Sequence, residues 1–132
     1  MTSAERKENK QAILLAEDSS VQQLVIVRQL KKLGYTNLTT VSNGQEAMAM
    51  VKAYEYALIL MDCEMPILDG FEATLLIRDY EFKLGRHTPI IAVSGHSFDN
   101  NAQRYLEKGM DDCLIKPIKI EELKILLEKY LS

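Results

Sequence analysis

The hydrophobic residues of this chain gather in short runs that alternate with longer amphipathic stretches. Runs of four or five mostly apolar residues are typical of strands in a parallel sheet that is covered on both faces. They fall at residues 12–16, 38–41, 57–61, 89–93 and 112–115. The longer stretches have the periodicity of helices with one buried side. These predicted helices cover residues 19–33, 44–54, 70–84, 98–108 and 119–131.

Several predicted helices carry suitable residues at their ends. Gly34 and Gly109 follow predicted helices, where glycine readily adopts the left-handed conformation that closes a helix. Ser42 or Asn43 can cap the start of the second helix with a side-chain oxygen. Five strand–helix units in alternation predict a (βα)₅ fold, which is a doubly wound α/β domain around one parallel five-stranded sheet.

The composition is that of an ordinary globular domain. The chain has 132 residues, of which 47 % are hydrophobic and 27 % charged, and it can bury a sizeable core. We expect residues 1–10 to form a flexible N-terminal extension and residues 11–132 to form the folded domain. No apolar run approaches the roughly 20 residues of a membrane span, and no signal peptide is visible, so we expect a cytoplasmic protein. The net charge of −3 argues against a nucleic-acid partner.

The two cysteines, Cys63 and Cys113, do not have the spacing of metal ligands. A reduced compartment fits them best. We therefore expect them to behave as small apolar residues without a redox role.

Acidic side chains follow two of the predicted strands. Glu17 and Asp18 come directly after the first strand, and Asp62 closes the third. Strands one and three are neighbours in the commonest order of five strands, so the three carboxylates should converge at the carboxyl edge of the sheet. Such like charges raise one another's pKa unless a cation lies among them. Oxygen ligands with room for water favour Mg²⁺ over zinc, and Mn²⁺ could substitute.

Two further strand ends complete the predicted site. The fourth strand ends at Ser94, which is followed by the small Gly95, and the fifth ends at Lys116. A lysine beside carboxylates and a metal ion is suited to a phosphoryl group. A carboxylate can accept that group as an aspartyl phosphate while the metal and the lysine offset its charge. The pattern therefore predicts Asp62 as the nucleophile.

With these residues in place, the chain resembles the response-regulator receiver domains, the phospho-acceptors of two-component signalling. The motifs that carry the resemblance are "ILLAEDSSVQQ", "MDCEMPILDGFEAT", "PIIAVSGHS" and "GMDDCLIKPI". It runs from about Gln11 to Leu131, and the second and fourth motifs are most similar to receivers of hybrid histidine kinases. The resemblance implies a flavodoxin-like fold with strand order 2-1-3-4-5. Whether the domain stands alone or belongs to a hybrid kinase stays open.

The resemblance implies a role for each residue of the site. Asp62 is then the phosphorylated aspartate, Asp18 a direct ligand of Mg²⁺, and Glu17 a ligand through water. The backbone carbonyl of Glu64 supplies a further metal ligand. Ser94 and Lys116 stand where relatives contact the phosphoryl group.

Neighbouring positions are expected to tune how long the phosphate lasts. Glu64 and His96 stand at positions where the side chains of relatives border the phosphoryl group. Gly95, which directly precedes His96, is a third such flanking position. A general base is one hypothesis for His96, and an exposed loop histidine is the other. The bond before Pro117 is often cis in relatives, and we expect a cis bond here.

The sequence departs from the receiver pattern at Cys113. Relatives usually carry Tyr or Phe three residues before the lysine, and that ring swings inward when the hydroxyl residue moves. A thiol cannot report the movement as a ring does. A route for the signal through the 94–98 loop and the fourth helix is the alternative.

The first predicted helix is more apolar than one buried stripe requires. Its apolar residues, which cover nearly the whole circumference, are Val21, Leu24, Val25, Ile26, Val27 and Leu30. One interpretation is a docking surface for a histidine kinase or a histidine phosphotransfer protein, as the resemblance implies, and the other is burial under flanking loops. The face formed by the fourth helix, fifth strand and fifth helix could support a weak homodimer.

Other functions compete with phosphorylation. A flavodoxin needs a hydroxyl- and glycine-rich phosphate loop after the first strand, where this chain has "AEDSS". A phosphatase with an aspartate nucleophile would carry its Asp-x-Asp pair there. The main alternative is a receiver-like module that signals through protein contacts without phosphorylation. A true receiver would catalyse only its own phosphorylation and dephosphorylation.

Overall fold

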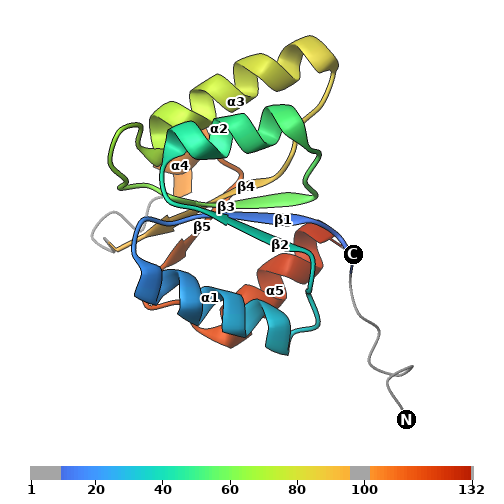
Figure 1. Cartoon of the computed structure of the whole chain (residues 1–132), viewed down its shortest axis with the longest axis vertical. Helices are drawn as coiled ribbons and strands as arrows, with labels where there is room; N and C mark the ends of the chain where they lie inside the picture. Colours follow the sequence, from blue (N-terminus) through green and yellow to red (C-terminus); the bar gives the residue numbers. More distant parts are fainter. Residues whose placement is uncertain (1–9, 96–101, 132) are drawn as a thin grey trace.

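The computed structural model describes residues 10–95 and 102–131, which form a central sheet with helices on both sides (Figure 1). The strands are β1 (Ile13–Ala16), β2 (Leu38–Val41), β3 (Leu58–Asp62), β4 (Ile90–Ser94) and β5 (Asp112–Ile115). The helices are α1 (Ser20–Lys32), α2 (Gly44–Ala53), α3 (Gly70–Leu84), α4 (Ala102–Glu107) and α5 (Ile120–Leu131). All strand pairs are parallel, and the order is β2-β1-β3-β4-β5. The predicted fold class and strand order are confirmed.

The observed boundaries differ slightly from the predicted ones. Ala12 and Pro89 each lie one residue before their strands, and Pro89 has no backbone N–H to donate to a ladder. Lys116 follows β5 and does not end it. The predicted start of the fourth helix at 98–101 and nearly all of the predicted extension at 1–10 lie outside the described residues.

The two faces of the sheet are buried by different helices. Side chains alternate between the faces along each strand. Leu14 and Ile59 point into a core that α2, α3 and α4 cover, whereas Leu15 and Leu60 point into a core that α1 and α5 cover (Figure 1). The strand β3, which ends at Asp62, is the central strand of the sheet. All five of its residues are buried.

Side-chain caps begin the first three helices at the carboxyl edge of the sheet. Ser19 caps α1, Asn43 caps α2, and Asp69 caps α3 by accepting hydrogen bonds from backbone N–H groups. Asp69 forms a reciprocal capping box with Glu72. Of the two candidates for α2, the structure therefore uses Asn43. These caps set where the loops after β1, β2 and β3 turn into helices.

The glycines that follow two of the helices agree with the sequence predictions. Gly34 and Gly109 have φ of 99° and 94°, in the left-handed region.

Both cysteines are free; Cys63 is buried and Cys113 is partly buried. Burial raises the pKa of the Cys63 thiol to about 12, which keeps it protonated and unreactive. Among the residues that the structure describes, no helix is long and apolar enough to cross a membrane.

Candidate functional site

The register of the sheet brings four predicted site residues to one edge. The residue before Glu17 is paired with the residue before Asp62. Asp62 in turn is paired with the residue before Ser94. Ser94 is paired with the residue before Lys116. Glu17 and Asp62 therefore lie at the same level, and Ser94 and Lys116 each follow one residue further along the next strand.

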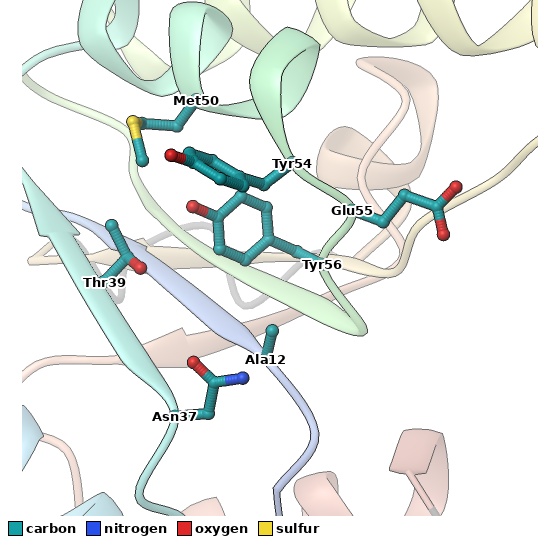
Figure 2. Close-up of a pocket in the computed structure, with 7 residues that line it drawn as sticks. All are labelled: Ala12, Asn37, Thr39, Met50, Tyr54, Glu55 and Tyr56. Atoms are coloured by element: carbon teal, nitrogen blue, oxygen red, sulfur yellow. The ribbon is translucent and has the colours of Figure 1, made fainter.

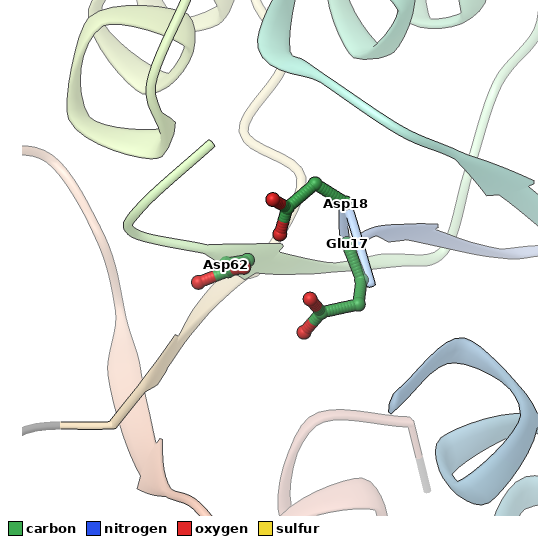
Figure 3. Close-up of side chains that lie close together, drawn as sticks. All are labelled: Glu17, Asp18 and Asp62. Carbon is green, nitrogen blue, oxygen red and sulfur yellow. The ribbon is translucent and has the colours of Figure 1, made fainter. Parts of the chain in front are cut away.

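Three carboxylates meet at this edge, as the sequence predicts. Glu17, Asp18 and Asp62 each offer one oxygen, and these oxygens lie within 4.8 Å of one another (Figure 3). Glu17 and Asp62 are only 1 % and 3 % exposed, whereas Asp18 is open to solvent. An all-oxygen donor set with one open side suits a hard divalent cation that keeps some of its water.

Lys116 contacts two of these carboxylates. Its Nζ lies 2.9 Å from Oε1 of Glu17 and 3.4 Å from Oδ2 of Asp62. Burial lowers the pKa of Lys116, but the hydrogen bond to Glu17 and the two negative charges outweigh burial, so its pKa lies above the usual 10.5. The ammonium group is thus held charged beside the predicted nucleophile.

The carboxyl group of Asp62 is costly to ionise where it lies. Burial raises its pKa to about 7, and the charge of Glu17 adds to this rise. The N–H of Glu64 donates a hydrogen bond to Oδ1 at 3.1 Å, and this bond and Lys116 partly oppose the shift. A buried carboxylate beside another one is stabilised by any further positive charge. The site therefore favours a cation at its open side.

Gly70 lets the loop after β3 return close to Asp62, and no role was predicted for it. A Cβ on Gly70 would lie 2.2 Å from the backbone oxygen of Asp62. The N–H of Gly70 donates to the oxygen of Cys63 at 3.2 Å, which closes the loop. This loop also brings the N–H of Glu64 onto the Asp62 carboxylate. The only sequence signal was a glycine directly after the capping residue Asp69.

A family model decides the classification of this fold and site. The model is described as the response regulator receiver domain, and it matches residues 13–128. The chain belongs to this family. The hybrid signal transduction protein dokA of Dictyostelium discoideum is 37 % identical over 132 residues, which is all of this chain and 8 % of that protein. The receiver domain spans 17 % or less of the length of the first three curated relatives that it matches.

Two solved receiver structures illustrate the likeness. The receiver domain of a sensor histidine kinase from Pseudomonas aeruginosa, solved with a magnesium ion in its active site cleft, has a TM-score of 0.82 and 41 % identity, covering 92 % of this chain and 98 % of that one. The receiver domain of Ssk1 from Saccharomyces cerevisiae, in a co-crystal with the histidine phosphotransfer protein Ypd1, has a TM-score of 0.82 and 29 % identity, covering 92 % and 88 %. The chain is a receiver domain of two-component phosphorelay signalling.

The other predicted residues around the receiver site have different surroundings. Ser94 ends β4 and is 4 % exposed. Gly95 is exposed, with open space where a Cβ would lie. Glu64 is also exposed, beside the acidic trio. His96 lies outside the described residues, and so does the part of the predicted 94–98 exit route that follows Gly95.

The remaining two predicted positions lie in β5 and just after it. Cys113 is partly buried and packs against the core under α2, α3 and α4. The Lys116–Pro117 peptide bond is cis, which is the isomer that the resemblance implies. The Cys113 thiol takes no part in the contacts of Asp62 described above, and the effect of this departure on how the signal leaves the site stays a prediction.

A pocket of about 410 Å³ lies at the opposite edge of the sheet (Figure 2). It is lined by Ala12, Asn37, Thr39, Met50, Tyr54, Glu55 and Tyr56. These residues come from the start of β2, from the segments just before β1, β2 and β3, and from the end of α2. No residue of the acidic trio lines this pocket, so it is separate from the receiver site.

Proposed function

We propose that this receiver domain accepts a phosphoryl group on Asp62 in a reaction that requires Mg²⁺. The observation that carries the proposal is the convergence at one sheet edge of a buried aspartate, two further carboxylates and a charged lysine 3.4 Å from the aspartate. Three carboxylates this close in a partly buried place repel one another, and a bound cation would relieve that repulsion.

The acidic trio fits a magnesium ion. Asp18 and Asp62 would bind it directly, Glu17 through a water molecule, and the backbone carbonyl of Glu64 would add a further ligand. Carboxylate and carbonyl oxygens are the ligands that Mg²⁺ prefers, and Mn²⁺ could substitute. When bound, the ion neutralises negative charge on the phosphoryl oxygens.

Residues of the chain carry out the transfer itself. A carboxylate oxygen of Asp62 attacks the phosphorus of a phosphohistidine, so that a P–O bond forms while the P–N bond breaks and the imidazole leaves. Lys116 pairs with the phosphoryl oxygens, and the Ser94 hydroxyl donates a hydrogen bond to one of them. Water later attacks the phosphorus, releasing inorganic phosphate and restoring the Asp62 carboxylate. The domain thus acts only on itself.

We place the phosphodonor, a histidine kinase or a histidine phosphotransfer protein, on α1. Val21, Leu24 and Val25 are 67 %, 51 % and 43 % exposed, while Ile26 and Leu30 of the same helix are buried. An apolar patch beside a reaction site is typical of a protein-docking surface. The yeast complex of a receiver with a phosphotransfer protein supports this kind of partner. A cytoplasmic location and a weak homodimer through α4, β5 and α5 stay predictions.

Intact-mass measurement tests the proposed reaction. With Mg²⁺ and acetyl phosphate the chain should gain one labile group of about 80 Da, and chelation of the metal should prevent the gain. Hydroxylamine should remove the group, since it cleaves acyl phosphates. A chain that neither gains mass nor binds beryllofluoride with Mg²⁺ would instead be a module that signals by contacts alone.

Docking on α1 can be tested apart from the chemistry. Leu24→Glu should slow phosphoryl transfer from a phosphorylated histidine phosphotransfer protein about tenfold or more, because a charge replaces a central apolar contact. The rate with acetyl phosphate should stay unchanged, because that donor needs no docking surface. Ile125→Glu on α5, at a residue that is 66 % exposed, is the matched control. Equal transfer rates in the two variants would place the donor elsewhere.

A further inference from the structure

The side chain of Gln23 on α1 bridges the ends of β1 and β2. Its Nε2 donates to the backbone oxygen of Glu17 at 2.6 Å and to that of Val41 at 3.2 Å. The same Val41 oxygen accepts a hydrogen bond from the N–H of Glu17 at 3.0 Å. The backbone of Glu17 is therefore held at both its N–H and its carbonyl group.

This clamp restricts the direction of the Glu17 carboxylate. One oxygen, Oε2, accepts a hydrogen bond from the N–H of Ser19 at 3.1 Å, and the other, Oε1, contacts Lys116 at 2.9 Å. The residue is 1 % exposed, so it has little room for another rotamer. Asp18, the next residue, leaves the sheet from the same clamped backbone. Loss of the Gln23 bonds would loosen both carboxylates together.

A second glutamine on α1 reaches the lysine side of the site. The Nε2 of Gln29 donates to the backbone oxygen of Ile118 at 2.8 Å, and Ile118 lies two residues after Lys116. The Oε1 of Gln29 is buried and accepts no hydrogen bond from the residues that the structure describes. Burying an unsatisfied acceptor costs stability, which offsets much of what the Nε2 bond contributes. The effect of Gln29 is therefore mainly on the position of the segment after Lys116.

We propose that Gln23 and Gln29 are positioning residues that tie α1 to the two sides of the receiver site. Gln23 sets the geometry of Glu17 and Asp18, and Gln29 sets that of Lys116. The inference rests on the proposed function. Since α1 also bears the exposed apolar residues of the proposed docking surface, a donor protein seated there acts on both sides of the site through one helix. By linkage, donor binding and Mg²⁺ binding then change each other's affinity by the same factor.

Methionine variants separate the two roles. Gln→Met removes the N–H donors with little change in side-chain volume. The variants are Gln23→Met, Gln29→Met and, as the matched control on the same helix, Gln22→Met. Calorimetry on the folded chain measures the affinity for Mg²⁺. Beryllofluoride binding is then measured at saturating Mg²⁺, and thermal unfolding is measured with EDTA present.

Each variant has its own expected signature. Gln23→Met should weaken Mg²⁺ binding about 3- to 10-fold, the effect of losing the hydrogen bonds that hold one ligand segment. Gln29→Met should leave Mg²⁺ affinity within about twofold but weaken beryllofluoride binding about 3- to 10-fold, because only the lysine side is disturbed. Gln22→Met should change neither quantity.

Other outcomes overturn the proposal. If Gln23→Met and Gln29→Met bind both ligands as Gln22→Met does, the glutamines have no positioning role, even where the unfolding temperature falls. Equal losses in all three variants would mean a general effect of altering α1. A parent chain that binds no Mg²⁺ would instead contradict the proposed function itself, so the two failures are distinguishable.

Discussion

Asp62→Asn is expected to abolish the labile mass gain of about 80 Da that acetyl phosphate and Mg²⁺ produce in the parent chain. An amide is a far weaker nucleophile toward phosphorus than a carboxylate, and it has no negative charge for a metal ion. The rate of phosphoryl acceptance should therefore fall about 100-fold or more. A time course of intact mass measures it directly. The neighbouring Lys116 and Glu17 stay in place in the variant, so the result reports on the nucleophile.

The same variant should be more stable than the parent chain when EDTA is present. Burial raises the pKa of Asp62 to about 7, above the usual 3.8, so the ionised carboxylate weakens folding. This penalty is complete above pH 7 and disappears as the pH falls from 7 toward 4 and below, where the folded and unfolded chains both hold the proton. The free energy of unfolding of Asp62→Asn should exceed that of the parent by on the order of 2 kcal/mol at pH 8 and by little below pH 4.

Asp79→Asn is the control for both effects of the Asp62 substitution. The Asp79 side chain is 73 % exposed and pairs with Lys83 at 3.7 Å on the surface of α3. The Asp79→Asn substitution should leave phosphoryl acceptance intact and add no stability at pH 8, since exposed ion pairs contribute little. A mass gain in Asp62→Asn would show that another residue is the nucleophile. Parallel stability curves of Asp62→Asn and the parent against pH would contradict the raised pKa.

Gly70→Ala is expected to cost about 3 kcal/mol or more of unfolding free energy. The new Cβ would lie 2.2 Å from the backbone oxygen of Asp62 and 3.0 Å from the Cα of Cys63. Both are backbone atoms at the end of a fully buried strand, so relief requires a shift of the strand or of α3. Urea unfolding monitored by circular dichroism measures the loss. Mg²⁺ binding should weaken as well, because the loop that bears Glu64 moves with Gly70.

Gly95→Ala is the matched control for Gly70→Ala. Among the residues that the structure describes, no atom lies within 4 Å of the position that a Cβ on Gly95 would take, so the free energy of unfolding should change by less than about 0.5 kcal/mol. If Gly70→Ala were as stable as Gly95→Ala, the close approach of the loop to Asp62 would not constrain the fold. Comparison of the two variants thus tests the close approach of Gly70 to the backbone of Asp62, separately from the general effect of replacing a glycine.

The order of apolar runs and amphipathic stretches was enough to predict the fold class. Runs such as 57–61 are too short and too apolar for surface helices, and their alternation with helices leaves a parallel sheet as the natural solution. The strand order 2-1-3-4-5 came from the resemblance to receivers and not from the pattern. The site residues could be located because each ends or directly follows a strand, and parallel strands end at one edge; Asp62 ends β3 and Lys116 follows β5.

The orientation of these residues depended on the tertiary structure. Nothing local to Glu17 says that its carboxylate is almost fully buried against Lys116, which is 99 positions later in the chain. The bond from Gln29 to Ile118 spans 89 positions, and the need for glycine at Gly70 arises from the backbone of β3. Periodicity and capping are properties of neighbouring residues, and the sequence therefore determined the elements and the chemistry at their ends. Contacts between distant segments follow from how the layers pack, so only the folded chain decided the burial, pKa and positioning of the site.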